Sequence, residues 1–364
     1  SVPGQVRLSM SSSSAVDGAG ILANIEFEII GAPGSSSALT ISNILLNDGA
    51  IPVELGAGMF NVDNVYNVSG QTTFWNGGTA VPGTTLTLTG DHIYEALSDS
   101  EGNYIIQGAA IDSYVLVPSK QDGDNGISAY DASFALQHDV GLITLSGSQA
   151  IAADVNSNGN ITSMDAAYIL QKAAGLISLP FPGSGVVWKF EPPQRNIAEL
   201  TEDLSGQDFT GILLGDISGN WTNPGTLGQP INNNFPQTAS ATLTIPEVNV
   251  LPNGSVDVPI LLDITNAELL GADIIFTYDP THVSISNVRL GSLAAGWSIA
   301  SNLTEQGVVR IALAGAMPIT SDGQLVVFTA TALGEPGTES ELTLTRGELN
   351  EGAIPSDLVS NYIY

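Results

Sequence analysis

An internal repeat is the feature that most constrains this chain. Residues 4–52 align without a gap with residues 307–355, and the two copies share the runs Gly49-Ala50-Ile51-Pro52 and Gly352-Ala353-Ile354-Pro355. A long strand-like stretch precedes the later copy, whereas almost nothing precedes the earlier one. A β-domain with half of its strands leaves edges unpaired and apolar faces exposed. We therefore expect the first copy to be completed from outside the chain, by the upstream part of a longer precursor or by another copy of the molecule.

Composition excludes several classes of partner and of stabilising bond. The chain has 8 Lys and Arg against 37 Asp and Glu, which gives a formal net charge of −29. Nucleic acid is excluded as a natural partner because phosphate contacts need basic patches. The absence of cysteine excludes disulfides and thiolate metal sites. No apolar run is long enough to span a membrane. With only 12% charged residues, the profile is typical of compact secreted β-domains, so we predict an extracellular or cell-surface location.

Three stretches of the sequence predict β-structure. Apolar and polar residues alternate between Gly/Pro/Ser turns in residues 1–62 and again in residues 240–364, as in antiparallel sandwiches. Residues 63–117 form another β-unit, which contains the hairpin motif Asp99-Ser100-Glu101-Gly102-Asn103-Tyr104. This unit resembles the transthyretin-like modules named after the carboxypeptidase regulatory domain. In relatives, these modules are spacers and stabilisers. Residues 180–239 are rich in Pro, Gly and Asn and predict an irregular extension and linker.

Residues 118–179 instead predict helices, one of which follows a loop with cation-binding spacing. In residues 154–165, oxygen-bearing side chains stand at loop positions 1, 3, 5 and 12, and glycine stands at position 6. Ca²⁺ takes six to eight oxygen ligands, and this spacing wraps them around one point. The alternative is an Asn/Gly-rich turn that caps a helix. The predicted ligands are Asp154, Asn156, Asn158, the carbonyl of Asn160, Thr162 by its hydroxyl or a water, and Asp165.

A first loop of the same kind is less regular. With Asp131 at position 12, Lys120 occupies position 1, where a carboxylate is expected, and Asp122 and Asp124 occupy positions 3 and 5. Gly126 stands one place late. Two possibilities remain open for this loop. Either it is remodelled so that Asp122, Asp124 and Asp131 hold calcium, or it is empty.

The duplicated loop and helix resemble the dockerin module of cellulosomes. In that family each loop holds Ca²⁺, folding requires the ion, and loop positions 10 and 11 carry partner recognition in many members. Here these positions are Ala129-Tyr130 and Ser163-Met164. Because the two pairs differ, the near-symmetric pattern of dual-mode dockerins is absent, and the partner specificity stays open.

Residues 240–364 resemble a cohesin, the usual partner of a dockerin. The resemblance rests on the strand that ends in Tyr278-Asp279-Pro280 and on Asp322-Gly323-Gln324-Leu325. The family fold is a nine-stranded jelly-roll sandwich, and residues 1–62 then resemble the second half of a cohesin. The expected fold class is mainly β, with several β-sandwich modules (cohesin-like and transthyretin-like) and one small α-helical, dockerin-like calcium module.

No catalytic site is predicted. The three histidines lie in different modules, and no hydrolase, zinc-protease or phosphate-loop motif occurs. Four tryptophans could stack on sugars, although lone aromatics in β-domains more often belong to the core. Four Asn-x-Ser/Thr sites are candidate glycan acceptors: Asn67, Asn220, Asn253 and Asn302.

The resemblances imply a non-enzymatic, secreted bacterial structural protein that is stabilised by Ca²⁺. Our first hypothesis is head-to-tail assembly of copies into a filament or surface array, through strand complementation or cohesin–dockerin-type contacts. A second hypothesis is a fragment of a cellulosome-like scaffold or adhesin, which displays partner proteins that carry cohesins or dockerins. A third is a surface protein that binds polysaccharide.

Overall fold

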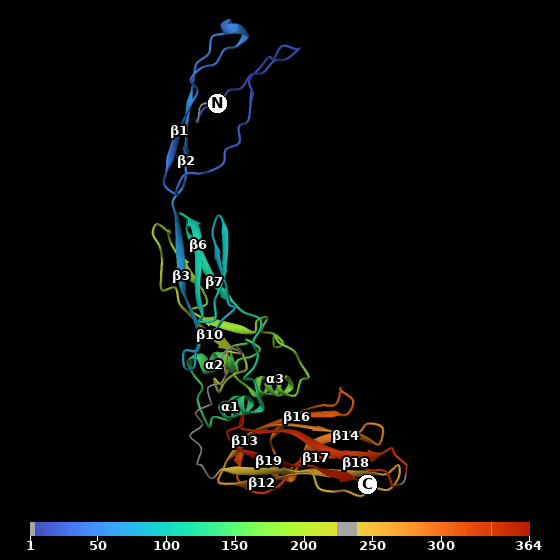
Figure 1. Cartoon of the computed structure of the whole chain (residues 1–364). Helices are drawn as coiled ribbons and strands as arrows, with labels where there is room; N and C mark the ends of the chain where they lie inside the picture. The colour runs from blue at the N-terminus through green and yellow to red at the C-terminus, as the bar shows by residue number, and fades with distance from the viewer. Residues whose placement is uncertain (1–3, 224–238, 336) are drawn as a thin grey trace. The chain divides into compact units, whose positions relative to one another are not determined.

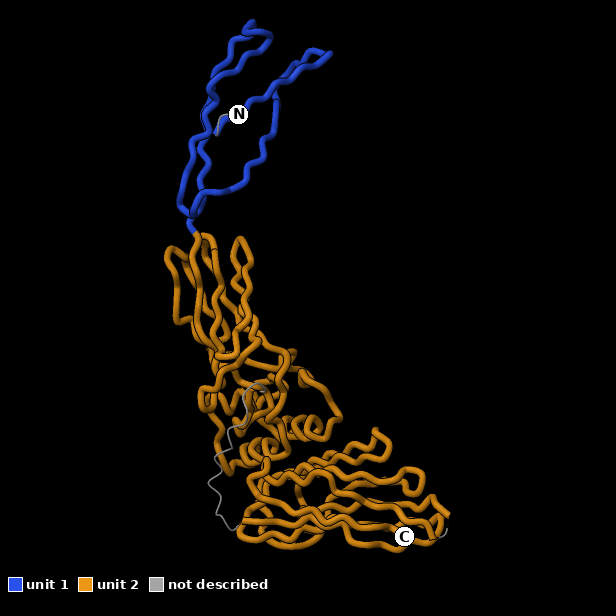
Figure 2. The backbone as a smooth tube through the Cα atoms, viewed as in Figure 1, with its two compact units in different colours: residues 1–64 blue, residues 65–364 orange. Residues whose placement is uncertain are grey.

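The computed structural model describes residues 4–223 and 239–364, except residue 336. The chain divides into two compact units, unit 1 (residues 1–64) and unit 2 (residues 65–364), which are coloured separately in Figure 2. Strands predominate, and the described residues contain three α-helices. The predicted class, mainly β with several sandwich modules and a small helical module, is confirmed.

Unit 1 contains one β-hairpin among its described residues. Strands β1 (Ser36–Thr40) and β2 (Ala57–Asn61) pair antiparallel, and a short 3-10 turn, η1 (Asn47–Gly49), lies between them. None of the described side chains in residues 4–64 is buried. This part of the chain therefore has no hydrophobic core of its own.

Residues 240–364 of unit 2 form a β-sandwich (Figure 1). One sheet has the strand order β14-β17-β12-β11-β19, and the other has the order β15-β16-β13-β18-β20. Alternating apolar side chains fill the space between the sheets, where the rings of Phe276 and Phe328 stack 4.7 Å apart. The elements are β11 (Ser240–Thr244), β12 (Ser255–Thr265), β13 (Leu269–Thr277), β14 (Val283–Leu290), η2 (Ser292–Ala294), β15 (Ser298–Asn302), β16 (Val308–Ile319), β17 (Gly323–Ala332), β18 (Ser340–Leu349), β19 (Ser356–Val359) and β20 (Asn361–Ile363).

The β-unit that begins at residue 65 has two four-stranded sheets, with the orders β6-β3-β10-β8 and β5-β4-β7-β9. Three of these strands come from residues 188–213, so the predicted irregular character of residues 180–239 is wrong for this part. Their ladder partners lie far away in the sequence, and short apolar runs between prolines and glycines give little local strand signal. The strands are β3 (Val65–Phe74), β4 (Thr85–Thr89), β5 (Ile93–Leu97), β6 (Asn103–Ala110), β7 (Tyr114–Ser119), β8 (Trp188–Glu191), β9 (Arg195–Ile197) and β10 (Phe209–Leu213).

Between these two β-modules lie the helices α1 (Ala129–Asp139), α2 (Gly147–Ala153) and α3 (Ser163–Ala173). Helices α1 and α3 start with the same capping box. The side chain at the N-cap, Ser128 or Thr162, accepts a backbone hydrogen bond, and the aspartate three residues later bonds back to the N-cap amide. Both helix starts are therefore determined locally by the sequence.

The helical module packs against the C-terminal sandwich. Helix α1 contacts β13 and β16, and α3 contacts β15 and β16 (Figure 1). The approach is close at Gly271 in β13, where an added Cβ would lie 2.6 Å from the backbone nitrogen of Tyr130. Small side chains from both sides belong to one buried cluster, which includes Ala129, Ala132, Ala135, Ala300, Ala312 and Ala314.

The sequence repeat is also a structural repeat. In β1–β2, Ala38 pairs with Met59, and in β18–β20 the residues 303 positions later, Glu341 and Tyr362, form the corresponding pair. The turns also match, because Asp48 and Glu351 both have a positive φ, 55° and 59°. Unit 1 thus folds its hairpin in the register of the complete sandwich.

Outside β1 and β2, the described residues of unit 1 lack regular strands for a topological reason. In the complete sandwich, β16 pairs with β13 and β15, and β17 pairs with β12 and β14. The repeat in unit 1, residues 4–52, corresponds to residues 307–355, and this range does not include β12 to β15. Only the hairpin can form, because its two strands are each other's partners.

Candidate functional site

The predicted calcium loop, residues 154–165, is held together by hydrogen bonds from its own backbone amides to its side-chain oxygens. The Asp154 carboxylate accepts hydrogen bonds from the amides of Asn158 and Gly159, each at 3.0 Å. The side-chain oxygen of Asn158 accepts from the amide of Asn160 at 2.8 Å. These contacts turn the side chains at positions 1 and 5 toward the inside of the loop.

Asp165 closes the loop from the start of α3. Its carboxylate accepts from the amides of Thr162, at 3.0 Å, and Asn156, at 3.4 Å, and the residue is fully shielded from solvent. Burial raises the pKa of Asp165, and the nearby negative charge of Asp154 raises it further. The carboxylates at positions 1 and 12 therefore repel each other, and a bound cation would relieve this repulsion.

The residues of loop 154–165 fit a hard cation. Two carboxylates, the Asn156 and Asn158 amides, the Asn160 carbonyl and the Thr162 hydroxyl are the oxygen types that Ca²⁺ prefers. No group of three or more His, Cys, Asp or Glu side chains among the described residues could hold a metal ion. The loop would therefore depend on its amide, hydroxyl and carbonyl oxygens as well as on its two carboxylates. A bound ion would hold the loop against the first turn of α3.

The first predicted loop is not assembled, because its acidic residues have separate partners. Asp122 pairs with Lys120 at 2.5 Å, and Asp124 pairs with Lys172 at 2.7 Å, which lowers the Asp124 pKa. Asp131 is fully buried and accepts hydrogen bonds from the amides of residues 217 and 218 at 2.8 and 2.9 Å. The structure therefore gives Asp122, Asp124 and Asp131 separate partners and does not assemble them as one ligand set.

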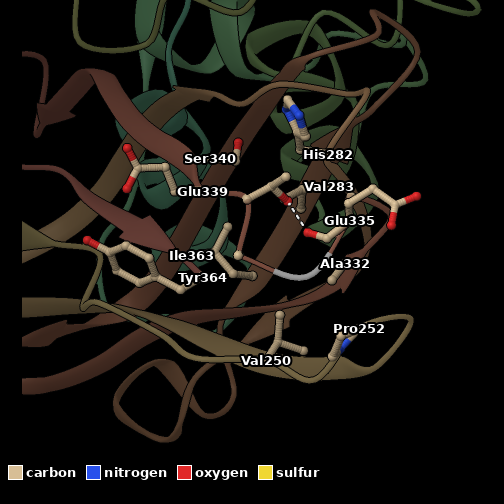
Figure 3. A pocket seen from close by; sticks show the side chains of 13 residues that line it. Val250, Pro252, His282, Val283, Ala332, Glu335, Glu339, Ser340, Ile363 and Tyr364 are labelled. Atoms are coloured by element: carbon tan, nitrogen blue, oxygen red, sulfur yellow. Dashed lines mark hydrogen bonds between the residues drawn. The ribbon is translucent and has the colours of Figure 1, made fainter.

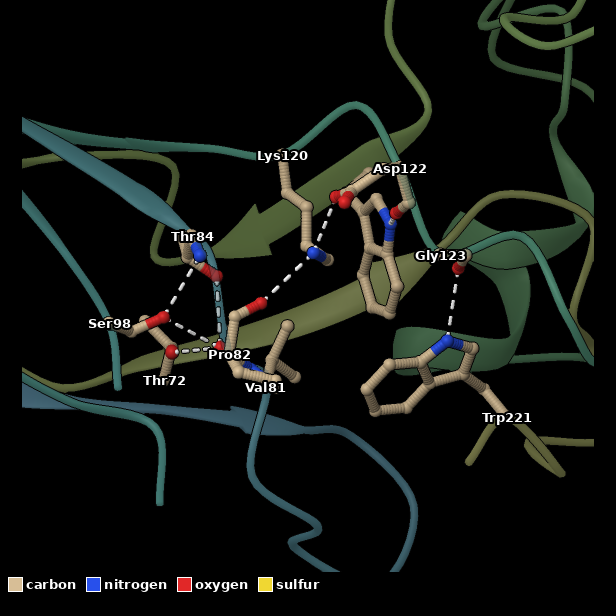
Figure 4. A network of polar contacts seen from close by, with 10 residues as sticks. Thr72, Val81, Pro82, Thr84, Ser98, Lys120, Asp122, Gly123 and Trp221 are labelled. Carbon is tan, nitrogen blue, oxygen red and sulfur yellow. Dashed lines mark hydrogen bonds and ion pairs between the residues drawn. The ribbon is translucent and has the colours of Figure 1, made fainter. Parts of the chain in front are cut away.

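Lys120 occupies the position where a first calcium ligand was expected (Figure 4). Its ammonium group donates to the Pro82 carbonyl at 2.9 Å, and its side chain is only 6% exposed. The indole nitrogens of Trp188 and Trp221 donate to the carbonyls of Asp122 and Gly123. The segment after β7 is thus fixed by a lysine and two indoles.

We expect Lys120→Met to destabilise the fold without changing the amount of calcium bound. The substitution leaves the Pro82 carbonyl without its donor, which costs about 1–3 kcal/mol, and urea unfolding measures this loss. The matched control is Lys172→Met. That pair is more exposed, and its loss costs about 0–1 kcal/mol. A fall in calcium stoichiometry in the Lys120 variant would contradict this assignment.

The structure also bears on two other roles predicted for surface residues, sugar stacking by tryptophans and glycan attachment to asparagines. Trp188 and Trp221 are buried with Phe74, so these two indoles are part of the core and not available to stack on sugars. The amide of Asn302 donates to the Gly175 carbonyl at 2.9 Å, and this asparagine is buried as well. Asn302 is therefore not accessible as a glycan acceptor in this fold.

A small cavity of about 150 Å³ lies at the edge of the sandwich, next to the C-terminal residues (Figure 3). His282 lies at its rim and pairs with Asp279 at 2.9 Å. The other lining groups include Val250, Ile363 and Tyr364. The lining offers no set of converging catalytic groups.

Polar contacts fix the helical module on the sandwich. The amide of Ala129, in the first turn of α1, donates to the Asp273 carboxylate at 3.0 Å. The Ser128 hydroxyl donates to Glu351 at 2.7 Å. Elsewhere in the interface, the bond from Asn302 reaches Gly175, two residues after the end of α3. Burial raises the pKa of Asp273 to about 7.

Comparison with protein families matches residues 241–353 to the cohesin domain. No curated protein matches the chain. The sixth cohesin of scaffoldin B from Acetivibrio cellulolyticus, solved in complex with a Cel5 dockerin, is 19% identical over 34% of this chain and 97% of that chain, with a TM-score of 0.31. A non-cellulosomal cohesin from Archaeoglobus fulgidus is 16% identical over 34% of this chain and 90% of that chain, also with a TM-score of 0.31. A cohesin from Clostridium acetobutylicum is 18% identical over 34% of this chain and 89% of that chain, with a TM-score of 0.31.

The matched region covers β11 to β18 of the sandwich and includes the sequence motifs at residues 278–280 and 322–325. By their titles, the Acetivibrio cohesin was solved with a dockerin, whereas the Archaeoglobus cohesin is non-cellulosomal. None of the helices among the described residues has the length and apolar character needed to cross a membrane. The resemblance of this chain to cellulosomal cohesin proteins is thereby confirmed for its C-terminal sandwich.

Proposed function

We propose that this chain is a non-catalytic, extracellular scaffold-type protein that works through a cohesin–dockerin-type contact. One observation carries the proposal. A helical module with a calcium-type loop, residues 118–179, is packed on the sheet β15-β16-β13 of a sandwich that matches the cohesin domain. Several of the similar solved structures are, by their titles, cohesins bound to dockerins. Here, both parts belong to one chain.

The contact is suited to hold the two modules as one body. The buried alanines let α1 approach the sheet closely, and burial of apolar surface stabilises by about 25 cal/mol per Å². The bonds of Asp273, Glu351 and Asn302 give the contact a defined register. In this arrangement, the chain's own helices cover the β13-β16 face and exclude other partners from it.

We expect Gly271→Leu to open this contact. A Cβ at residue 271 meets the backbone of Ala129 and Tyr130 at 2.6–2.8 Å, and backbone atoms cannot move aside as a flexible side chain can. Hydrogen exchange should accelerate by at least about tenfold in α1, and the strands of the sandwich should keep their protection. The matched control is Gly20→Leu, because an added Cβ at Gly20 meets nothing within 4 Å.

The same pair of variants tests the scaffold function. A dockerin-bearing protein immobilised on a sensor should bind the Gly271→Leu chain and should bind the native chain and the Gly20→Leu chain much more weakly. Equal binding of all three chains would show that the covered face is not the partner site. If none of them binds, the cohesin–dockerin-type contact is confined to this chain and the display of partners is refuted.

A second candidate function, assembly by strand complementation, is favoured by the exposed apolar residues of unit 1. Leu22 is 61% exposed, whereas its repeat equivalent Leu325 is 0% exposed, and the values for Ile51 and Ile354 are 47% and 1%. Strands equivalent to β12–β15 would cover these residues. In a second copy, such strands are already paired within its own sandwich, so filament growth by this route requires exchange of strands between copies.

A further inference from the structure

Two segments that are far apart in the sequence form a second loop that resembles loop 154–165. They are residues 216–221, which follow β10, and residues 126–131, which enter α1. At Gly126, an added Cβ would lie 2.8 Å from Oδ1 of Asn220 and 3.1 Å from the backbone nitrogen of Trp221. The segments therefore touch where a continuous loop passes from its sixth to its seventh position. We call this arrangement the split loop.

The first half of the split loop repeats the contacts made by Asp154. The amide of Asn220 donates to Oδ1 of Asp216 at 3.1 Å, and the amide of Trp221 donates to Oδ2 at 2.9 Å. In loop 154–165, the amides four and five residues after Asp154 make the same two bonds at 3.0 Å. Asp216 thus stands at loop position 1, and Ser218 and Asn220 stand at positions 3 and 5.

The second half repeats the contacts made by Asp165. The amide of Ser128 donates to Oδ2 of Asp131 at 2.9 Å, as the amide of Thr162 does to Oδ2 of Asp165 at 3.0 Å. The other oxygen of Asp131 accepts from the amide of Ser218 at 2.9 Å, which ties the two halves together. Asp131 thus stands at loop position 12.

An unpaired oxygen marks the split loop as a place for a ligand. Oδ1 of Asn220 is buried and has no hydrogen-bond partner. The matching oxygen of Asn158 accepts from the amide of Asn160. A buried acceptor without a donor costs about 1–3 kcal/mol, and such groups in native proteins commonly mark an ion or a water. The half-buried Asn220 therefore presents a shielded side-chain oxygen that is free to bind a ligand.

The sandwich adds a third carboxylate. Glu351, in the turn between β18 and β19, accepts from the hydroxyls of Ser128 at 2.7 Å and Ser218 at 3.2 Å. Asp131 and Asp216 are fully buried, and Glu351 is half-buried.

Within the described residues, these three carboxylates form no ion pair with a lysine, arginine or histidine. Their hydrogen-bond donors are backbone amides and hydroxyls, together with the contact between Asp131 and Glu351. Buried carboxylates must be neutralised, either by protons or by a bound cation. Oxygen ligands from carboxylate, amide and hydroxyl groups favour Ca²⁺ among the common cations.

We propose that Asp131, Asp216, Ser218, Asn220 and Glu351 form a Ca²⁺ site at the split loop. The three carboxylates are not a sufficient metal-binding group by themselves, so the site needs its amide and hydroxyl oxygens, as loop 154–165 does. The ligands come from the start of α1, from the segment after β10 and from the sandwich. Calcium bound at this site joins the helical module to the sandwich, so calcium binding favours the docking of the two modules.

Calcium titration of the full chain by calorimetry tests the proposal. We expect two ions per chain, one in loop 154–165 and one in the split loop. Glu351→Gln keeps the size of the side chain and an acceptor for both serine hydroxyls but removes the charge. It should weaken one of the two affinities at least tenfold and leave the other unchanged. Glu341→Gln on β18 is exposed and serves as the charge-matched control.

A second readout separates the two loops. Trp221 is part of the split loop, whereas loop 154–165 contains no tryptophan, so terbium emission sensitised by tryptophan should persist in Asp165→Asn and fall in Glu351→Gln. Circular dichroism without calcium checks that each variant is folded, and Ser218→Ala replaces Glu351→Gln if the latter is not. A native stoichiometry of one ion that is lost in Asp165→Asn would overturn the proposal. So would two unchanged affinities in Glu351→Gln and Ser218→Ala.

Discussion

Asp165→Ala should abolish calcium binding at loop 154–165 and destabilise the start of α3. The substitution removes the position-12 carboxylate together with the capping box to Thr162. Loss of a cap costs about 0.5–2 kcal/mol, and loss of an ion present at 100 times its Kd costs about 2.7 kcal/mol more. Urea unfolding in calcium and in excess chelator, with calorimetric titration of the ion, measures both terms.

The control for this prediction is Asp165→Asn, which keeps an oxygen that can cap the helix but removes the charge. In Asp165→Asn, the free energy of unfolding should no longer depend on calcium. The variant should keep most of the stability that the native chain has in chelator. If chelator does not shift the unfolding midpoint of the native chain, the ion does not contribute to the fold. The prediction would then fail at its first step, before the variants are compared.

Supplying the missing strands to unit 1 should convert it from an exposed hairpin into a packed sandwich. We expect this result for a fusion in which residues 240–306 are joined by a flexible linker ahead of residue 4. These residues carry β11–β15, and β12–β15 are the partners that β16 and β17 have in the complete module. Burying a side chain such as Leu22 contributes about 1.5–3 kcal/mol, and several such side chains are exposed in unit 1.

Hydrogen exchange of residues 4–34 measures this completion. Their amides should exchange at least about 100-fold more slowly in the fusion, because a gain of 2.7 kcal/mol in local stability already gives that factor. The matched control carries Ile260→Pro and Ile274→Pro in the added segment, which removes ladder donors from β12 and β13. Equal exchange in the fusion, the control and the native chain would mean that the repeat does not form a sandwich.

The sequence patterns that predicted structure correctly are local ones. The helices predicted within residues 118–179 form, and the capping boxes that start α1 and α3 join residues three positions apart. The cohesin resemblance of residues 240–364 depends on alternation within single strands and on short turn motifs. The repeat itself is a comparison of sequence with sequence, and the register of β1–β2 follows it. In each case, the residues that form the sequence pattern are also the residues that form the local structure.

The first calcium loop was predicted from consecutive residues, and the structure gives the acidic residues of that stretch separate partners. With Asp131 at position 12, the spacing of a continuous loop puts Lys120 at position 1. In the structure, Asp216 instead makes the hydrogen bonds that Asp154 makes at position 1 of loop 154–165. A signal was present in the sequence. Asp216, Ser218 and Asn220 have the same spacing as Asp154, Asn156 and Asn158. The sequence alone does not connect the spacing of residues 216–220 with the start of α1, because α1 lies earlier in the chain.

By itself, the sequence determined the order of the modules, the repeat between residues 4–52 and 307–355, and the ligand spacing of loop 154–165. These are local properties of the chain, governed by periodicity, turn chemistry and caps. Only the tertiary structure decided that β8–β10 complete the middle sheets, that α1 and α3 cover the sandwich, and that Asp131 meets Asp216 and Glu351. These contacts join residues that are distant in the sequence, and they exist only where packing of the modules repays the entropy of bringing those residues together.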